Sequence, residues 1–588
     1  MKFPYGISDF FQVITENYFY VDRTSDIRLI EQAGKQLLFL RPRRFGKSLW
    51  LSTLENYYDI ARADEFERLF GHLAIGQNPT PLHNRYFVLK WDFSMVDPSG
   101  DVADVRRSLH NHLNSRIHDF SKRYGDFLSG EIEIDRRDAF FSFESVLTAV
   151  RPTVYRLYLM IDEYDNFANE VMTASQDRYY ALLSGEGLLK TVFKAVKGSA
   201  AGRGIDRVFI TGVSPVALSD ITSGYNVAEN IYLLPQFNDL CGFTQKEVAQ
   251  VLHRVARECG FSETKANEAL TMIRAFYDGY RFSHRAEERV YNPTLVLYFM
   301  KALQRERQYP RKMLDFNLSM DRAKLAYVSR LPNGGQVILD ALGGQYLPRV
   351  QELSDRFGVK EMLNIGEDVD LIASLLYYLG VLTLGDETEF GELTLKIPNL
   401  IVRRLYAEQM REMLLPDHKK GQQIAQTLYQ TGKMQPLCDF VEQRYFPVFD
   451  NRDYRWANEL TIKTAFLTLL FNDILYIMDS EPALEREYAD LIMIVRPDMR
   501  QYRLLDILIE FKYLKLKDEL GISKAEARAM SRKDLEALPQ VREKMTQART
   551  KLAGYRQALQ ARYKDTLRLR VYAVTAIGFE RLVWQEVT

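Results

Sequence analysis

Four short, mainly apolar runs stand out in the first 235 positions. The runs are Gln36–Leu40, Tyr86–Asp92, Leu157–Ile161 and Arg207–Val213. A strand that is buried on both faces reads as such a run, whereas a strand with one exposed face alternates between apolar and polar residues. Segments that read as helices separate the runs. The pattern therefore predicts a parallel sheet with helices on both faces, which is a three-layer α/β domain over residues 1–235.

Residues 236–415 predict a mainly helical region, because apolar residues recur there at spacings of three and four. Within this region, Ser374–Leu384 and Leu393–Pro398 predict a helix and a two-stranded ribbon, and a further helix begins at Asn399. This order is typical of a winged helix. Such a module binds DNA in some proteins and serves as a packing lid or interaction surface in others, and the sequence leaves both uses open.

Residues 416–588 predict a third domain, of mixed α/β kind, in which helices precede two further apolar runs. The runs are Tyr488–Ile494 and Leu504–Leu514. In the second run, alternation along a strand places Glu510 and Lys512 on one face and apolar side chains on the other. Two charges on an apolar strand are costly to bury unless they pair with each other or bind a ligand.

Size and composition narrow the class of protein. With 588 residues the chain is too long for one core, and 46% hydrophobic with 27% charged residues is typical of globular domains. The formal net charge is zero, so any nucleic acid must be bound by a local basic patch. The three cysteines are widely spaced, the N-terminus lacks the apolar core of a signal peptide, and no apolar run is long enough to span a bilayer. We expect a cytoplasmic protein without a membrane partner.

The first apolar run leads into Gly46-Lys47-Ser48, the end of a phosphate-binding loop of the form G-x-x-x-x-G-K-[ST]. Arg41 stands where the first glycine of that loop is expected. A strand before the loop and a helix after it are the context that a phosphate loop needs. Gly46 would let the backbone approach the phosphates, Lys47 would reach the β- and γ-phosphates, and Ser48 would ligate magnesium. Alone, the triplet fits a basic turn at the start of a helix as well.

The third apolar run ends in Asp162-Glu163, which matches the Walker B form of four apolar residues followed by Asp-Glu. The carboxyl ends of parallel strands face the ligand crevice of such a sheet. Asp162 would hold magnesium through water, and Glu163 would orient or deprotonate the attacking water. Thr211, near the end of the fourth run, stands where many ATPases keep a polar residue that senses the γ-phosphate. A turn residue at a strand end is the equal alternative for Thr211.

Five strings in order along the chain resemble the bacterial and archaeal AAA-ATPase-like proteins. They are Asn17–Thr24, Arg41–Leu49, Ile210–Pro215, Phe276–Phe282 and Tyr291–Pro293. In that family the loop reads RPRRFGKS, so the resemblance makes Arg41 the family's own form and implies ATP as the nucleotide. We count Arg41 and Arg44 among the cofactor-binding residues of the loop. Arg43, Arg44 and Arg281 are candidates for an arginine finger, and a solvated or phosphate-facing basic surface is the competing interpretation.

The C-terminal domain carries a second candidate site. Asp490 lies near the start of one apolar strand and can meet Glu510 across the ladder of the next. Two carboxylates that converge on one point suit magnesium or manganese. Lys512 could then position the attacking water or stabilise the charge that develops on a phosphate. This D-x(n)-E-x-K arrangement is typical of metal-dependent phosphodiester hydrolysis.

The arrangement resembles the PD-(D/E)XK nuclease superfamily, which has a restriction-endonuclease-like fold and often follows this type of ATPase. The resemblance implies that Asp490, Glu510 and Lys512 form the catalytic core and that Glu459, on the preceding helix, is the first acidic position. The chain departs from the superfamily at Ala489, which replaces the usual proline. An active nuclease is one outcome, and an inactive domain that holds DNA or has a structural role is the other.

Local charge favours a polyanion near this site. Residues 541–570 hold Glu543 and Asp565 against nine basic residues: Arg542, Lys544, Arg549, Lys551, Arg556, Arg562, Lys564, Arg568 and Arg570. A basic helix there could follow a DNA backbone, although a solvated helix face has the same composition. Gln547 lies on this helix where the superfamily often keeps a polar residue.

The sequence as a whole predicts an ATPase that controls a metal-dependent DNA endonuclease, with Mg²⁺ or Mn²⁺ at the nuclease site, in defence against foreign or mobile DNA. The alternative is an ATP-driven oligomeric switch or scaffold, a homo-oligomer whose nuclease-like domain is inactive and binds nucleic acid or protein. The two differ in whether Glu510 and Lys512 are needed for activity.

Overall fold

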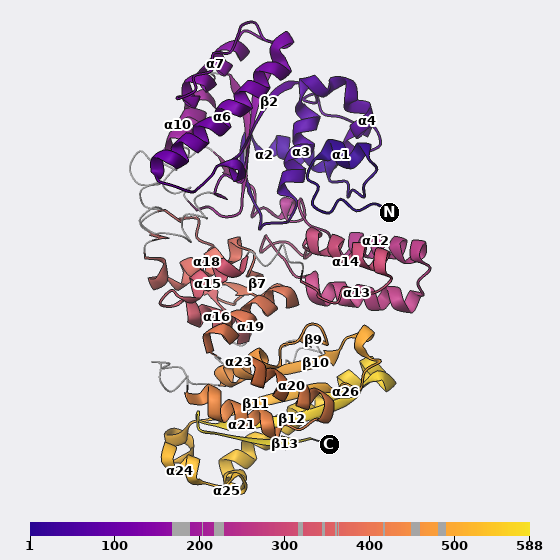
Figure 1. Ribbon diagram of the computed structural model, residues 1–588, viewed down its shortest axis with the longest axis vertical. Helices are drawn as coiled ribbons and strands as arrows, with labels where there is room; N and C mark the ends of the chain where they lie inside the picture. Colours follow the sequence, from indigo (N-terminus) through magenta and orange to yellow (C-terminus); the bar gives the residue numbers. More distant parts are fainter. Residues whose placement is uncertain are drawn as a thin grey trace.

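The computed structural model describes most of the chain, in three parts that follow one another along the long axis of the molecule (Figure 1). The described residues are 1–166, 188–200, 202, 204–216, 228–314, 321–343, 347–358, 361–362, 364–414, 418–447, 459–479 and 490–587. An α/β domain lies at one end, a helical middle region follows, and a second sheet with its helices lies at the other end. Within the described residues, no helix combines the length and the apolar character that crossing a membrane requires.

The N-terminal sheet is parallel throughout and has the strand order β2-β3-β4-β1-β5. Its strands are β1 (Gln36–Leu40), β2 (Tyr86–Asp92), β3 (Arg156–Asp162), β4 (Ile205–Gly212) and β5 (Glu229–Asn230). The four predicted strands and their parallel pairing are therefore confirmed, and β5 adds a short edge. β1 lies between β4 and β5, so the loop after β1 leaves the sheet close to the carboxyl ends of β3 and β4.

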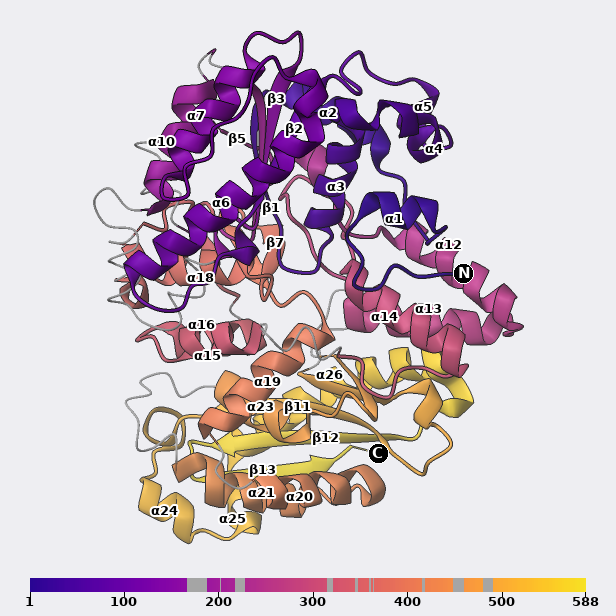
Figure 2. The same cartoon turned by 45° about the horizontal axis from the view of Figure 1, so that its top comes forward.

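Helices cover both faces of this sheet, as Figures 1 and 2 show. One face holds α6 (Val102–Tyr124), α7 (Ala139–Val150) and α10 (Leu188–Ala200), and the other holds α1 (Phe10–Thr15) and α3 (Lys47–Tyr58). The strands between them are buried almost completely, which explains why they read as mainly apolar runs. The predicted three-layer arrangement is confirmed.

The middle region is mainly helical, as predicted, with one small antiparallel sheet. One helical group comprises α12 (Gln245–Cys259), α13 (Glu263–Tyr277) and α14 (Pro293–Glu306), and a second comprises α15 (Asp321–Ser329), α16 (Gly334–Gly343), α18 (Val369–Tyr378) and α19 (Leu400–Leu414). The ribbon of β7 (Thr383–Glu387) and β8 (Leu393–Lys396) follows α18, and β6 (Arg349–Val350) pairs with β8. The order of helix, ribbon and helix is as expected, and its assignment as a winged helix stays a prediction.

The C-terminal sheet is mixed and has the order β13-β12-β11-β10-β9. Its strands are β9 (Tyr476–Asp479), β10 (Leu491–Val495), β11 (Asp506–Leu514), β12 (Leu569–Ile577) and β13 (Arg581–Glu586). β10 runs antiparallel to both β9 and β11, and β12 runs parallel to β11. The beginning of the run predicted from Tyr488, including Ala489, lies outside the described residues.

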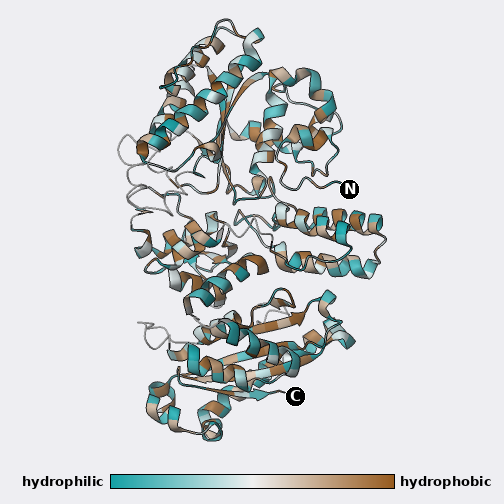
Figure 3. Cartoon of the chain, in the orientation of Figure 1, coloured by the Kyte–Doolittle hydropathy of each residue, from teal (hydrophilic) through white to brown (hydrophobic). Residues whose placement is uncertain are grey.

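Helices lie on both faces of the C-terminal sheet. They include α20 (His418–Thr431), α23 (Glu459–Leu470) and α26 (Pro539–Tyr563). α26 packs on β11 and β12, while α23 contacts β11 from the side that holds Phe511. The strands of this sheet are among its most apolar segments in Figure 3. The predicted domain boundaries after residues 235 and 415 stay predictions.

Candidate functional site

The loop after β1 has the backbone shape of an anion-binding turn. Arg44 and Gly46 both have positive φ, of 69° and 96°. Gly46 is the N-cap of α3, and a Cβ built on it would meet no atom within 4 Å, so its conformation rather than crowding favours glycine there. The loop directs the first turn of a 12-residue helix toward the cavity described below. Unpaired backbone N–H groups at such a helix start favour phosphate.

Lys47 is held at the centre of this loop and is only 3% exposed. Its Nζ donates to the backbone oxygens of Arg41 and Pro42, at 3.0 and 3.4 Å, and lies 3.1 Å from Oε1 of Glu163. Burial works to raise the pKa of Glu163, but the ammonium of Lys47, helped by Arg43, outweighs it and holds that pKa below its usual value. Glu163 is therefore ionised at neutral pH and faces the loop.

The carboxyl ends of β3 and β4 are joined by side-chain hydrogen bonds. The hydroxyl of Thr211 donates to Oδ1 of Asp162, and both side chains are buried. Asp165 accepts hydrogen bonds from the backbone N–H groups of Val213 and Ser214 at 3.0 and 2.8 Å. These bonds fix Asp162 and Glu163 beside the loop. The roles of Ser48 and Asp162 as magnesium ligands, and of Thr211 as a γ-phosphate sensor, stay predictions.

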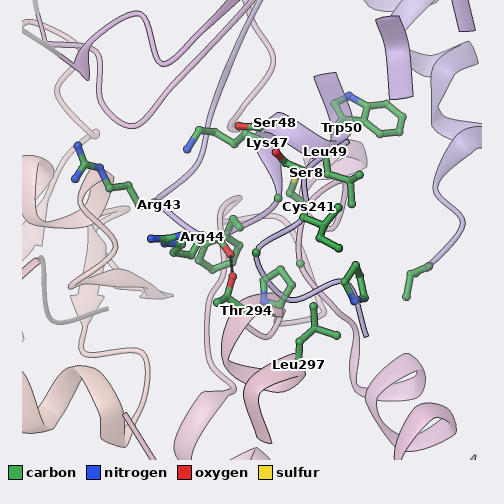
Figure 4. A pocket seen from close by; sticks show the side chains of 18 of the residues that line it. Ser8, Arg43, Arg44, Lys47, Ser48, Leu49, Trp50, Cys241, Thr294 and Leu297 are labelled. Carbon is green, nitrogen blue, oxygen red and sulfur yellow. Dashed lines mark hydrogen bonds between the residues drawn. The ribbon is translucent and has the colours of Figure 1, made fainter. Parts of the chain in front are cut away.

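A cavity of about 630 Å³ opens beside the loop (Figure 4). The loop residues from Arg43 to Trp50 line one side, with the hydroxyl of Ser48 among them. Apolar side chains line much of the rest of the wall, namely Pro4, Ile7, Phe19, Val21, Leu240, Phe243, Pro293 and Leu297, and polar residues such as Ser8, Arg23, Thr53 and Ser94 lie among them. The volume lies within the range of small-molecule sites, and the cavity suits a ligand with phosphates at one end and a flat apolar group at the other.

Three strings that looked unrelated in the sequence meet at this cavity. Phe19–Val21 and Arg23 come from the first string, the loop comes from the second, and Pro293 comes from the last, with Thr294 directly after it. Thr294 also donates from its hydroxyl to the backbone oxygen of Arg44, at 2.9 Å. The residue types fit a Mg²⁺-nucleotide, because the cavity combines a phosphate-type loop, a buried lysine and a hydroxyl with nearby carboxylates.

The predicted arginines take different positions. Arg41 lies behind the loop, where its guanidinium donates to the backbone oxygens of Tyr232 and Phe237. A contact between its side chain and the nucleotide, expected from the loop sequence, does not fit this orientation. Arg44 lines the cavity and is exposed. Arg43 also lines the cavity and donates to Asn166, and Arg281 lies 3.3 Å from Asp386 in the ribbon.

The second site is a charged cluster within the C-terminal sheet. Glu510 lies in the middle of β11 and is 1% exposed. Its Oε1 accepts a hydrogen bond from Nζ of Lys512 at 2.8 Å and lies 3.3 Å from Nζ of Lys551 on α26. Its Oε2 is buried and has no hydrogen-bond partner within the described residues. A buried carboxylate oxygen without a partner fits a position that a cation would fill.

Asp490 meets this cluster across the ladder, as expected. Leu491 pairs with Ile509 in antiparallel register, which places Asp490 opposite Glu510. Oδ2 of Asp490 accepts a hydrogen bond from the backbone N–H of Phe511 at 2.8 Å. Burial, and next the negative charge of Asp490, raise the pKa of Glu510 above its usual value. The contribution of Asp490 to this shift shows that the two carboxylates lie close together.

Glu459 joins the cluster from the start of α23. Its Oε1 lies 3.7 Å from Nζ of Lys512, and burial raises its pKa. Within the described residues, no three His, Cys, Asp or Glu side chains are placed to hold a metal ion together. Magnesium is commonly held by one or two carboxylates with waters and substrate phosphates, so the metal role of Asp490 and Glu510 stays a prediction.

Sequence reasoning missed one lysine of the cluster and underrated another. Lys463 is buried on α23, one turn after Glu459, and its Nζ lies 3.7 Å from Oδ1 of Asp490. The spacing of four from Glu459 was the available indication. Lys551 counted only as one charge of the basic segment, although it reaches Glu510. Gln547 lies on the same face of α26 as Lys551, four residues before it, and its side-chain amide donates to the carboxylate of Glu543.

The comparisons agree with the N-terminal fold. Residues 4–222 match the family model AAA-ATPase_like, described as a predicted AAA-ATPase. Together with the parallel sheet and the phosphate-type loop, this match defines the class: the N-terminal part of the chain is similar to a predicted AAA-type ATPase. Over a longer stretch, the chain is 25% identical to an uncharacterized protein in the vnfD 5' region of Azotobacter chroococcum mcd 1. That alignment spans 449 residues and 74% of each chain.

Two solved structures have a loosely similar shape. The Walker-type ATPase paby2304 of Pyrococcus abyssi shares 16% identity with a TM-score of 0.37, covering 66% of this chain and 96% of that one. The ORC2 protein of Aeropyrum pernix, in ADPNP-ADP complexes, shares 12% identity with a TM-score of 0.30, covering 68% and 97%. TM-scores of this size carry no functional argument.

Proposed function

We propose that the protein binds ATP in the cavity beside the loop and hydrolyses it. The observation that carries the proposal is the position of Lys47, buried between two loop carbonyls and Glu163 at the edge of a cavity of about 630 Å³. Its ammonium would meet the β- and γ-phosphates where the loop and the start of α3 present backbone N–H groups. The apolar wall opposite would take the adenine.

The residues around Lys47 support hydrolysis as well as binding. Ser48 and Asp162 would hold Mg²⁺, which supplies charge neutralisation on the phosphates when bound. Glu163 is ionised and can orient a water or accept its proton once Lys47 has turned to the phosphates. Thr211 keeps Asp162 in place through its hydroxyl. Each role is taken by a side chain at the carboxyl end of a strand or at the start of α3.

ATP hydrolysis by the purified full-length protein tests this proposal. We expect Mg²⁺-dependent turnover that falls at least 100-fold in Lys47→Ala and in Glu163→Gln, because one loses the phosphate contact and the other the water-orienting group. Lys246→Ala, at an exposed position on α12, is the matched control and should keep wild-type turnover. Absence of turnover in the wild-type protein, or full turnover in Lys47→Ala, would contradict the proposal.

We also propose that the C-terminal domain cuts DNA in a metal-dependent reaction that the ATPase controls. The order of α23, three antiparallel strands, α26 and a strand parallel to β11 supports a restriction-endonuclease-like domain. Asp490 and Glu510 would hold Mg²⁺ or Mn²⁺, and Lys512 would position the attacking water or stabilise charge on the phosphate. Glu459 would help to hold the ammonium of Lys512 in position through its carboxylate. Such a pairing suits defence against foreign or mobile DNA.

One observation favours the alternative, in which the domain is inactive and the protein is an ATP-driven switch. Lys512 and Lys463 already lie beside Glu510 and Asp490, so both carboxylates have a cation near them without a metal. A domain with this arrangement could bind nucleic acid through the basic residues of α26 without cutting it.

Cleavage of plasmid and single-stranded DNA distinguishes the two. The full-length protein is incubated with Mg²⁺ or Mn²⁺, with and without ATP, beside Glu510→Gln, Lys512→Met and Lys47→Ala. We expect cutting that is lost in the first two variants and reduced in the third, while Glu352→Gln, at an exposed position, cuts normally. DNA binding without cutting under every condition would favour the switch, and cutting that survives Glu510→Gln would remove the assigned site.

A further inference from the structure

Arg41 occupies an unusual environment for a positive charge. It is 1% exposed, and its guanidinium donates to the backbone oxygens of Leu40 and Tyr232 at 2.8 Å and of Phe237 at 2.6 Å. Within the described residues it has no carboxylate partner, and its Nε makes no hydrogen bond. Burial lowers its pKa to about 10, which leaves it charged at neutral pH. A buried charge without a counter-ion lowers the free energy of unfolding, so the Arg41 guanidinium destabilises this region of the fold.

Aromatic rings from two parts of the chain hold this guanidinium. It lies 4.5 Å from the ring centre of Phe39 in β1 and 4.1 Å from that of Phe282, which follows α13. Such contacts partly compensate for the missing counter-ion. Phe45, at the other end of the loop, packs edge-to-face on Tyr280 and Phe282, with centroids 4.8 and 5.2 Å away. Both ends of the phosphate loop therefore rest on residues 280–282.

Residues 280–282 are in turn fixed to α18 and β7. The hydroxyl of Tyr377 donates to the backbone oxygen of Phe282 at 3.1 Å, and the N–H of Arg281 donates to the hydroxyl of Thr383 at 2.7 Å. Figure 2 shows α18 and β7 directly below the N-terminal domain. Gly380, two residues after α18, lies against the loop itself, since a Cβ added there would lie 2.6 Å from Cβ of Pro42.

The packing continues from α18 to the helix that carries Glu459. α16 contacts both α18 and α23. The approach of α16 to α23 is very close at Gly343, where an added Cβ would come within 1.4 Å of Cδ1 of Leu460. Leu460 is the residue after Glu459. Closely packed elements transmit small displacements because they cannot be compressed.

We propose that Arg41 is a positioning residue that joins the phosphate loop to the middle region, so that nucleotide bound at Lys47 alters α18 and, through α16, α23. Lys47 donates to the backbone oxygens of Arg41 and Pro42. Phosphates that draw the ammonium into the cavity weaken these bonds and release the two residues that touch Phe282 and Gly380. The coupling from the loop to α18 rests only on the proposed ATP binding. A functional effect of that coupling at α23 rests also on the nuclease proposed above.

Hydrogen exchange of the full-length protein, with and without a non-hydrolysable Mg²⁺-ATP analogue, tests whether Arg41 couples the phosphate loop to α18. In the wild type we expect the amide exchange rates of residues 371–384 to change at least threefold on binding. In Arg41→Gly, which restores the ordinary loop residue, the analogue should bind within about fivefold of wild-type affinity while this change falls below a third of its size. Arg41→Lys should behave likewise, because an ammonium cannot reproduce the forked contacts.

Two variants on the α18 side guard against misfolding of the loop variants. Tyr377→Phe removes only a hydroxyl, and Gly380→Ala places a methyl group against Pro42 at a φ of +76°. Both should weaken the response of 371–384 without abolishing analogue binding. The proposal is overturned if the wild-type response is absent, if it persists in full in Arg41→Gly, or if Arg41→Gly binds no better than Lys47→Ala. Hydrogen exchange is measured without DNA, so a protein that does not cut DNA would still give a valid test of the coupling between the loop and α18.

Discussion

The ion pair of Lys47 and Glu163 makes a quantitative prediction about the nucleotide-free protein. Lys47 is 3% and Glu163 18% exposed at the side chain, with 3.1 Å between Nζ and Oε1. Removal of one partner from a buried pair costs about 3–5 kcal/mol, because the other charge stays buried alone. Since Glu163 keeps some contact with solvent, we expect Lys47→Met to lower the free energy of unfolding by about 3 kcal/mol.

The double variant tests the physical reason. Glu163→Gln removes the stranded charge, so Lys47→Met/Glu163→Gln should lose about 2 kcal/mol less than the sum of the two single variants. Urea unfolding of the full chain is followed by tryptophan fluorescence, in which Trp50 and Trp91 report the N-terminal transition and Trp456 and Trp584 add signal from the C-terminal part. Losses that add to within 0.5 kcal/mol would refute a direct interaction between the two side chains and with it the assigned position of Lys47.

Three further predictions concern single groups. Burial, with the nearby Asp239 carboxylate, raises the pKa of Asp26 to about 6, above an unfolded value of about 3.9, so stability falls as pH rises from 4 to 6. Asp26→Asn should therefore add about 1–2 kcal/mol at pH 7 and nothing at pH 4 in urea unfolding, and an equal gain at both would contradict this pKa. Thr211→Val frees Asp162 and should lower ATP turnover about tenfold with little change in KM, whereas unchanged turnover would make Thr211 a turn residue. Lys551→Ala should make the slope of log K for DNA binding against log salt concentration less negative by about 1, which corresponds to one phosphate contact. An unchanged slope would exclude that contact.

The sequence predicted the N-terminal fold well because its strands are buried on both faces. The apolar runs in β1, β2, β3 and β4 are the direct consequence of that burial, and the loop between β1 and α3 contains the residues that a phosphate turn requires. The alternation in β11 likewise predicted which face holds Glu510, since a strand has a fixed period of two.

Contacts between distant segments were beyond the sequence. Nothing in the pattern around Arg41 indicated that its guanidinium would turn behind the loop, because its partners lie about 190 residues away at Tyr232 and Phe237. For the same reason Lys551 was not connected with Glu510. Both cases depend on how separate elements pack, and periodicity within one element carries no information about that packing.

Binding of Mg²⁺-ATP to the full-length protein, measured by isothermal titration calorimetry, tests the central claim most directly. We expect one saturable site that is lost in Lys47→Ala and retained with unchanged affinity in Lys246→Ala. No heat of binding in the wild type, or equal binding in Lys47→Ala, would contradict the assignment of the loop and its cavity as the nucleotide site.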